Sequence, residues 1–386
     1  VSNGFIADGG VFQPDWKDRA GALHRQFVEM NLSPGGSADL LAATLFVGRL
    51  LQRYGGCRTG LKDGTLGYSK WLPGHNAMFG YGLLCSGQGN QHRAMFDILE
   101  DNSDAQAVLN SSAAFFGCHP VEYLQRLSDA ELYQNLHAQP LIAVLQMATW
   151  TALRDHLPPP KVIAGYSLGE VVAYGCAGSL NTEQLLTLVQ RRAMLMDAAA
   201  PQDSAMLAIR GLLKAQVEDL CSETGVEIAI INGNDHFVLG GTGAAIRRIE
   251  QHPLAEQASQ CKRLAVTVPS HTSYMSRAAL LFANDLAKAG LTEFRSPVLA
   301  GTNGGMVRRP TEAIAALTHQ ISTPINWLAC VLAAVETGSR VMLELGPGTA
   351  LKKIQQEQSP MVAVRAVEDF RSLQGVTDWL SRQLHR

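Results

Sequence analysis

Residues 161–170 read Lys-Val-Ile-Ala-Gly-Tyr-Ser-Leu-Gly-Glu, a short apolar run that ends in the pattern Gly-x-Ser-x-Gly. This pattern is typical of a turn between a buried strand and a helix, with the serine at its apex. Gly165 and Gly169 lack the Cβ atoms that would clash in so tight a backbone. A helix around Val171 would direct its N-terminal N–H groups at negative charge that develops beside the serine. The stretch therefore predicts an α/β fold in which Ser167 is a nucleophile.

The composition narrows the class of protein. The 386 residues are 46% hydrophobic and 17% charged, which is typical of a chain with a large core and more than one domain. A net charge of −2 gives no support to a nucleic-acid or membrane partner, and no apolar run is long enough to span a bilayer. The seven cysteines show no Cys-x-x-Cys spacing, and the histidines show no metal-ligand spacing. We therefore expect a cytoplasmic protein without a signal peptide, a disulfide framework, a metal site or a bound cofactor.

Three segments differ in their pattern. Residues 1–77 are expected to form a short helical N-terminal extension, with two helices followed by a Gly-rich linker. Residues 78–200 and 273–386 alternate strands and helices and are expected to form one catalytic subdomain. Residues 201–272 follow the order strand–helix–strand–strand–helix–strand, with the last strand predicted at 263–268. This order is typical of a ferredoxin-like unit, and it predicts a small subdomain inserted into the larger one.

Five motifs occur in a fixed order along the chain. They are Gly87-Gln88-Gly89-x-Gln91, Gly165-Tyr166-Ser167-Leu168-Gly169-Glu170, Gln190-Arg191-Arg192 with Met196, Val268-Pro269-Ser270-His271 and Glu344-Leu345-Gly346-Pro347-Gly348. Together they resemble the malonyl-CoA:acyl-carrier-protein transacylase family over roughly residues 80–355. The resemblance implies an α/β-hydrolase-like core with an inserted ferredoxin-like subdomain.

The resemblance also implies a catalytic role for several residues. Ser167 would be the nucleophile and His271 its general base. No Asp stands in the expected place, so an oxygen of Gln320 would orient the histidine. The backbones of Gln88 and Leu168 would form the oxyanion hole.

Substrate binding is implied for a further group of residues. Arg192 would hold a free carboxylate of the acyl group through two parallel hydrogen bonds, which a lysine cannot reproduce. An acetyl group would leave this charge unpaired and would be disfavoured. The other residues expected to bind substrate are Tyr166, Ser270, Met196, Asn232 and Asn303.

One departure from the family's pattern, and a second resemblance near the N-terminus, point to one branch of the family. Tyr166 stands where the fatty-acid members usually carry His, which resembles the transacylase (epsilon) subunit of malonate decarboxylase. Residues 1–55, through the stretch 31–44, resemble the C-terminal end of triphosphoribosyl-dephospho-CoA synthase. That enzyme makes the prosthetic-group precursor of the decarboxylase carrier protein, and the part present here is too short for synthase activity. We therefore predict malonyl transfer from malonyl-CoA to the prosthetic-group thiol of an acyl carrier protein, in malonate decarboxylation and through a malonyl-Ser167 intermediate.

The sequence also allows three other hypotheses for the function. The nearest is a malonyl transacylase of fatty-acid or polyketide synthesis, which would use the same residues. A serine thioesterase or hydrolase is a second class, disfavoured by Arg192 and by the missing carboxylate partner of His271. A non-catalytic subunit that docks the carrier is a third, disfavoured by the intact motifs. In the favoured interpretation the partners are coenzyme A and the carrier protein, with no nucleic acid and no membrane.

Overall fold

The computed structural model describes residues 80–385 of the 386. The chain divides into two units, Val1–Pro73 and Gly74–Arg386. The helices and linker predicted within residues 1–77 lie outside the described residues. In the described part, helices and strands form a mixed α/β fold with two sheets, which confirms the predicted class.

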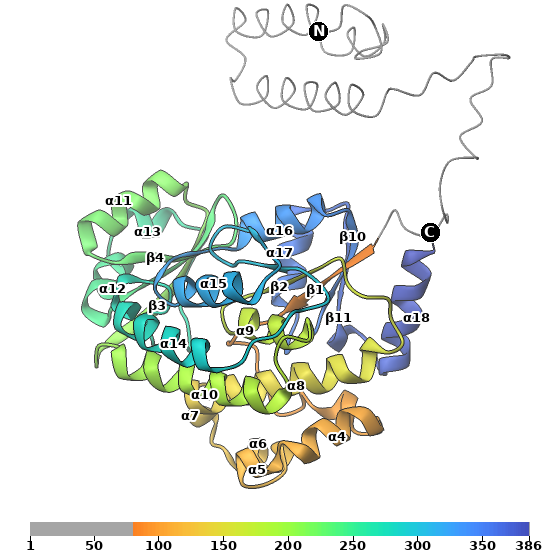
Figure 1. Cartoon of the computed structure of the whole chain (residues 1–386). Helices are drawn as coiled ribbons and strands as arrows, with labels where there is room; N and C mark the ends of the chain where they lie inside the picture. The colour runs from red at the N-terminus through yellow and green to blue at the C-terminus, as the bar shows by residue number, and fades with distance from the viewer. Residues whose placement is uncertain (1–79, 386) are drawn as a thin grey trace, which may run out of the picture. The chain divides into compact units, whose positions relative to one another are not determined.

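The larger sheet has six strands in the order β11-β10-β1-β2-β7-β8 (Figure 1). All neighbours are parallel except β8, which runs antiparallel to β7. The last residues of β1 and β2 pair with each other, so the two strands end side by side. The bounds are β1 Gly80–Cys85, β2 Val162–Gly165, β7 Val298–Leu299, β8 Met306–Val307, β10 Ser339–Glu344 and β11 Ala363–Ala366.

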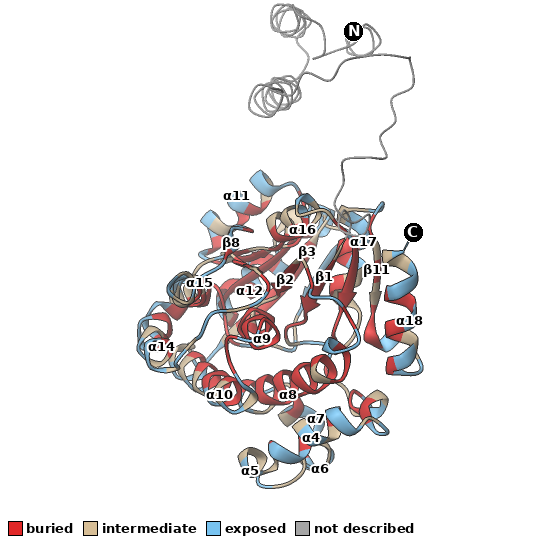
Figure 2. Cartoon of the chain, turned by 45° about the vertical axis from the view of Figure 1, so that its right-hand side comes forward, coloured by how far each residue is buried: buried red, intermediate tan, exposed pale blue. Residues whose placement is uncertain are grey.

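Helices cover both faces of the larger sheet (Figure 2). Leu83 and Ile163 enter one core, while Leu84 and Ala164 enter the other, as the two-residue period of a strand requires. Burial on both faces explains why β1 and β2 are apolar throughout. Within residues 80–385, no helix combines the length and apolar character needed to cross a membrane. The first core is covered by α4 Ser103–Ser111, α8 Asn135–Arg154, α9 Leu168–Cys176, α10 Thr182–Ala199, α14 Ser276–Lys288, α15 Pro310–Ser322 and α18 Leu373–Leu384, and the second by α16 Trp327–Glu336 and α17 Ala350–Gln358.

The smaller sheet has five strands in the order β6-β3-β5-β4-β9. Its first four strands are antiparallel to their neighbours, and β9 pairs with β4 in parallel. Leu207 and Ile209 face a separate core with the helices of this sheet, whereas Met206 and Val238 face the core that contains α16. The elements are β3 Ser204–Arg210, α11 Lys214–Thr224, β4 Glu227–Ile231, β5 His236–Thr242, α12 Gly243–Glu250, α13 Pro253–Gln257, β6 Gln260–Arg263 and β9 Ile325–Asn326.

One predicted strand is wrong. The prediction placed it at residues 263–268, but β6 covers Gln260–Arg263. Leu264, Val266 and Val268 are apolar at every second position, which is the pattern of a strand. In the structure these three side chains pack against the cores, but residues 264–268 form no strand. Alternating apolar residues can thus result from contacts with a core as well as from strand pairing.

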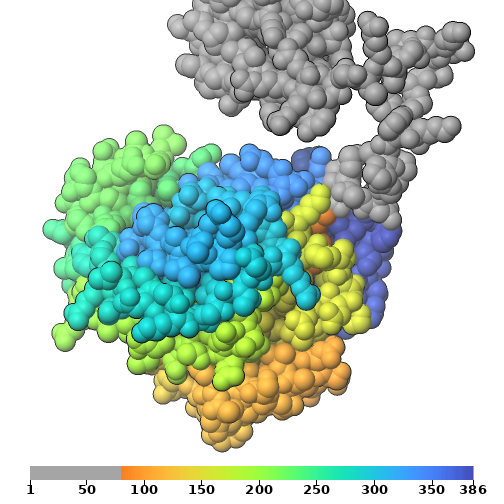
Figure 3. All heavy atoms as spheres, viewed as in Figure 1, coloured from red at the N-terminus to blue at the C-terminus, as the bar shows by residue number. Residues whose placement is uncertain are grey.

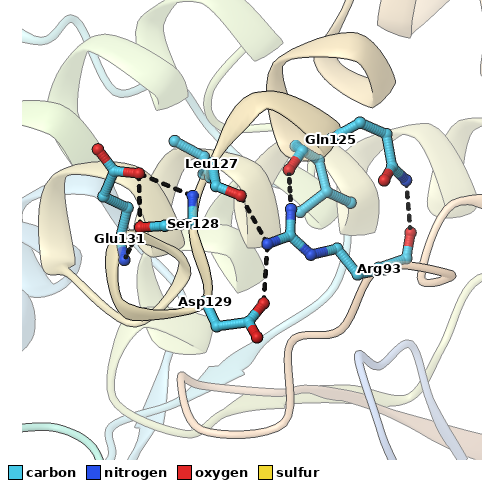
Figure 4. A network of polar contacts seen from close by, with 7 residues as sticks. Arg93, Gln125, Leu127, Ser128, Asp129 and Glu131 are labelled. Atoms are coloured by element: carbon cyan, nitrogen blue, oxygen red, sulfur yellow. Dashed lines mark hydrogen bonds and ion pairs between the residues drawn. The ribbon is translucent and has the colours of Figure 1, made fainter.

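Arg93 anchors the chain that follows the loop after β1 (Figure 4). Its guanidinium donates to the main-chain oxygens of Leu124 and Leu127, both at 2.6 Å, and to the Asp129 carboxylate at 2.9 Å. The Gln125 amide donates to the Arg93 carbonyl at 3.2 Å. These bonds fix the segment just beyond residues 86–91 against two short helices, α6 Pro120–Arg126 and α7 Asp129–Leu132.

Helices α14 and α15 lie side by side, and α14 also packs on α10 (Figure 3). Arg192 is on α10, and Gln320 is near the end of α15. His271 lies just before the short turn that opens α14. The packing of these helices therefore brings together residues that are far apart in the sequence.

Candidate active site

Ser167 lies at the tight turn between β2 and α9, as the sequence predicted. Its backbone has φ 56° and ψ −110°, a conformation that costs energy for a residue with a side chain. A Cβ on Gly165 would lie 2.1 Å from the carbonyl carbon of Gly169. A Cβ on Gly169 would lie 2.0 Å from the main-chain oxygen of Cys85, at the end of β1. The two glycines therefore permit the close contact of α9 with both strands that holds Ser167 in place.

His271 contacts Ser167 directly. The Nε2 atom of His271 lies 2.7 Å from Ser167 Oγ, and its Nδ1 atom lies 2.6 Å from the main-chain oxygen of Gln320. A carbonyl oxygen only accepts, so Nδ1 carries the proton and the lone pair of Nε2 faces the serine hydroxyl. His271 also has a positive φ of 63°, and its main-chain N–H donates to Ile321 at 3.0 Å. The structure thus brings together the three residues predicted as catalytic.

Burial keeps His271 neutral. The side chain is buried, and this lowers the pKa of His271 to about 3, with the nearby positive charge of Arg192 as the second cause. The hydrogen bond to Gln320 opposes the shift but is the smaller effect. At neutral pH the imidazole is therefore in the form that can accept a proton from Ser167.

Arg192 is a buried cation beside the nucleophile. Only 1% of the residue is exposed. Its guanidinium donates to Gln139 Oε1 at 2.9 Å, to Ser167 Oγ at 3.2 Å and to Gln320 Oε1 at 3.3 Å. Burial lowers the pKa of Arg192 to about 10, so the group stays charged at neutral pH. Its three hydrogen-bond acceptors are all uncharged, which leaves the guanidinium suited to an incoming anion.

Two buried residues at the site were not predicted. Gln139, on the apolar helix α8, accepts the hydrogen bond from Arg192. Glu170 stands at the end of the stretch quoted first, fully buried, and its Oε2 accepts from Gln320 Nε2 at 2.8 Å and from the Gly301 N–H at 3.0 Å. Burial raises the pKa of Glu170 to about 7, opposed by these hydrogen bonds and by Arg192. A polar residue inside an otherwise apolar helix was the signal for both.

The predicted oxyanion residues flank the serine. Leu168 follows it and opens α9. Gln88 lies in the loop after β1, and this loop runs against the elbow, because a Cβ on Gly87 would lie 2.7 Å from the main-chain oxygen of Tyr166. The Gln88 side chain donates to Asn135 Oδ1 at 2.9 Å. Both main chains are therefore held close to the elbow.

Tyr166 contacts two residues behind the elbow. Its ring packs edge-on against Trp327, with 5.3 Å between the centroids. The buried side chain of Asn232 lies close to the Tyr166 hydroxyl. Burial raises the pKa of Tyr166, so the phenol stays protonated. The structure therefore places two of the residues predicted to bind substrate in contact with each other.

Of the other residues predicted to bind substrate, two are buried near the site and one is exposed. Met196 is buried on α10, one helical turn after Arg192. Ser270 is buried next to His271, and its hydroxyl donates to the Val268 carbonyl at 3.3 Å. Asn303 is exposed in the turn between β7 and β8, where its side chain accepts from the Gly305 N–H at 2.8 Å. The hydrogen bonds of Asn303 are thus made within its own turn, apart from the Ser167 cluster.

The arrangement is suited to covalent acyl transfer. A serine hydroxyl with a neutral imidazole at hydrogen-bond distance can attack an acyl carbon. A buried guanidinium 3.2 Å from the same hydroxyl can bind an anionic group carried on that acyl chain. The helix that begins at Leu168 adds N–H groups at the point where negative charge develops.

Comparisons with known proteins agree with this chemistry. Residues 83–372 match the family model described as acyl transferase domain, and residues 2–58 match a second, described as ATP:dephospho-CoA triphosphoribosyl transferase. A malonyl CoA-acyl carrier protein transacylase from Haemophilus influenzae is 28% identical over 311 residues, 78% of this chain and 99% of that protein. Both resemblances stated from the sequence are confirmed.

Solved structures show the same architecture. A malonyl CoA-acyl carrier protein transacylase from Coxiella burnetii matches with a TM-score of 0.75 and 26% identity, covering 80% of this chain and 99% of that one. A type II PKS acyl-carrier protein in complex with its malonyl-transacylase matches with a TM-score of 0.74 and 26% identity, covering 78% and 99%.

The electrostatic coupling of His271 and Arg192 can be tested by titration. In the wild type, the NMR signals of His271 should stay those of the neutral ring well below pH 6.5, because burial and Arg192 lower its pKa. Arg192→Met should raise this pKa, since one of the two causes is removed, and the pKa should stay below 6.5 because burial remains.

Arg191→Met is the matched control. Arg191 is the neighbouring residue, but it is half-exposed and pairs with Asp285 at 3.2 Å. It should leave the titration of His271 unchanged. An equal shift in both variants, or none in Arg192→Met, would contradict the coupling.

Proposed function

The chain belongs to the acyl transferase domain family, and we propose that it transfers malonyl from malonyl-CoA to the prosthetic-group thiol of an acyl carrier protein. One observation carries the choice of malonyl: the charged guanidinium of Arg192 is buried 3.2 Å from Ser167 Oγ. A buried cation whose hydrogen-bond acceptors are all neutral favours an acyl group that brings its own carboxylate. Relatives named as malonyl transacylases support the same donor.

In the first half-reaction, Ser167 Oγ attacks the thioester carbon of malonyl-CoA. His271 Nε2 accepts the hydroxyl proton as the bond forms. The N–H groups of Gln88 and Leu168 stabilise the negative charge on the carbonyl oxygen. The C–S bond then breaks, the departing coenzyme A takes the proton from His271, and malonyl-Ser167 remains.

In the second half-reaction, the thiol of the carrier attacks the ester carbon of malonyl-Ser167. His271 accepts the thiol proton and returns it to Ser167 Oγ as the ester bond breaks. The main-chain oxygen of Gln320 keeps the imidazole in the required tautomer throughout. The carrier leaves with malonyl bound as a thioester.

The other predicted residues would shape the acyl pocket. Met196 is buried one turn from Arg192, and Ser270 is the small residue next to His271. Tyr166 and Asn232 lie next to each other behind the elbow. We assign Asn303 a place at the rim of the site, since it is exposed and two residues from Gly301.

We further propose that the carrier is the acyl-carrier subunit of a malonate decarboxylase, with a prosthetic group derived from dephospho-CoA. The match of residues 2–58 to ATP:dephospho-CoA triphosphoribosyl transferase supports this carrier. Tyr166 before the nucleophile supports it as well. A carrier of fatty-acid or polyketide synthesis is the alternative, supported by the relatives and by the complex with a type II PKS carrier.

We also propose a division of the described part into two subdomains. Residues 78–200 and 273–386 would form an α/β-hydrolase-like catalytic subdomain, and residues 201–272 a ferredoxin-like one. The strand order β6-β3-β5-β4 and its antiparallel directions support the second assignment. Strand β9, from the catalytic segment, extends this sheet and links the two.

The intermediate is tested by intact-mass spectrometry. After mixing with malonyl-CoA, the wild type should gain the mass of one malonyl group, and Ser167→Ala should gain none because it has no nucleophile. A malonylated Ser167→Ala protein would show that the acyl group is carried elsewhere.

Donor selection is tested with Arg192→Ala. This variant should lose malonyl transfer by on the order of 100-fold, because a charge-assisted contact to the carboxylate is removed. Acetyl transfer should be kept or improved, and Arg191→Ala should keep the wild-type preference. Equal losses with both donors would argue against recognition of the carboxylate.

The carrier is identified by offering malonyl-enzyme two purified acceptors in parallel. One is a malonate decarboxylase carrier with the dephospho-CoA-derived arm, and the other is a phosphopantetheine carrier of fatty-acid synthesis. We expect faster transfer to the first, read as the mass of the carrier. Preference for the second would assign the protein to lipid or polyketide synthesis.

A further inference from the structure

Both ends of the Gln320 side-chain amide are occupied by buried groups. Its Oε1 accepts from Arg192 Nη2 at 3.3 Å. Its Nε2 donates to Glu170 Oε2 at 2.8 Å and to the main-chain oxygen of Ser167 at 2.8 Å. The main-chain oxygen of the same residue holds His271. Gln320 therefore joins the nucleophile, the base and the cation of the site.

The chemistry of its neighbours determines which way this amide points. A guanidinium only donates, so Arg192 requires the oxygen end of the amide. Glu170 Oε2 accepts, so it requires the nitrogen end. The same carboxylate oxygen also accepts the Gly301 N–H, which ties it to the chain after β7. Glu170 thus holds the donor end of Gln320 from a fixed point on helix α9.

Burying the carboxyl group of Glu170 costs free energy that a residue needed only for packing would not require. The carboxyl is fully buried, and its Oε1 has no hydrogen-bond partner among the described residues. Burial raises the pKa of Tyr174 and of Cys330, and the charge of nearby Glu170 raises both further. An apolar side chain would pack here without the cost of burying a carboxyl group. A buried carboxyl group at this point therefore favours a role in the site.

We propose that Glu170 is a positioning residue that, through Gln320, orients both His271 and Arg192. This inference rests on the proposed malonyl transfer and deepens it, because it links the base of the reaction to the residue that selects the donor. Glu170 itself touches neither the acyl group nor the reacting atoms. Its effect on His271 should influence every donor, whereas its effect on Arg192 should influence only donors that carry a carboxylate.

The test compares three substitutions at Glu170 by the rate of Ser167 acylation, measured in single turnovers with malonyl-CoA and with acetyl-CoA. Glu170→Gln keeps the length and an acceptor oxygen, and should stay within about threefold of the wild type. Glu170→Ala removes the acceptor and should slow malonyl transfer by on the order of 10- to 100-fold, with a smaller loss for acetyl. Glu170→Asp keeps the charge but is one methylene shorter, and should resemble Glu170→Ala.

Tyr174→Phe is the matched control. It removes a buried hydroxyl that has no partner among the described residues, from the same helix and beside the same carboxyl, without touching Gln320. Its acylation rates should be unchanged. The fraction of molecules that form acyl-enzyme, together with thermal melting, separates slower chemistry from loss of folded protein, and rates are compared per active site.

The outcomes separate the inference from the function on which it rests. Rescue by Glu170→Gln together with a larger loss for malonyl than for acetyl supports positioning. The inference is overturned if Glu170→Ala matches the wild type, if both donors lose equally, or if Glu170→Asp is active while Glu170→Gln is not. A wild-type protein that malonyl-CoA does not acylate would instead remove the proposed function.

Discussion

The close approach of helix α9 to strands β1 and β2 is the constraint on which the site depends. Neither Gly165 nor Gly169 has room for a Cβ atom, because main-chain atoms of the neighbouring segments lie about 2 Å from where it would be. At this contact Ser167 adopts its positive φ. Because the strained turn lies at the ends of two parallel strands, the serine meets the loop after β1 and the start of α9 together.

Near the serine, two buried ionisable side chains are connected by a neutral one. Arg192 and Glu170 are both buried, and the amide of Gln320 lies between them. A direct ion pair would leave the guanidinium less available to a carboxylate on the acyl group. With Gln320 in between, Arg192 stays charged and Glu170 remains within electrostatic reach. The same positive charge also favours the neutral form of His271.

Much of the fold could be predicted from local patterns. Helices α10 and α16 are of this kind, because their apolar spacing and caps lie within the sequence itself. The strand predicted at 263–268 failed, because alternating apolar residues also occur where a segment packs on cores without pairing. The pairing of β9 with β4 could not be predicted either, since a two-residue strand carries no periodic signal.

The sequence by itself determined the elbow, because its strand, glycines, serine and helix are contiguous. It also indicated His271 and Arg192, through motifs that resemble a known family. Only the tertiary structure decided which groups hold these residues. Gln139 lies 53 positions from Arg192, and Glu170 lies 150 positions from Gln320. Hydrogen bonds over such separations depend on how helices α8, α9, α10 and α15 pack around the sheet, and no local pattern in the chain encodes that packing.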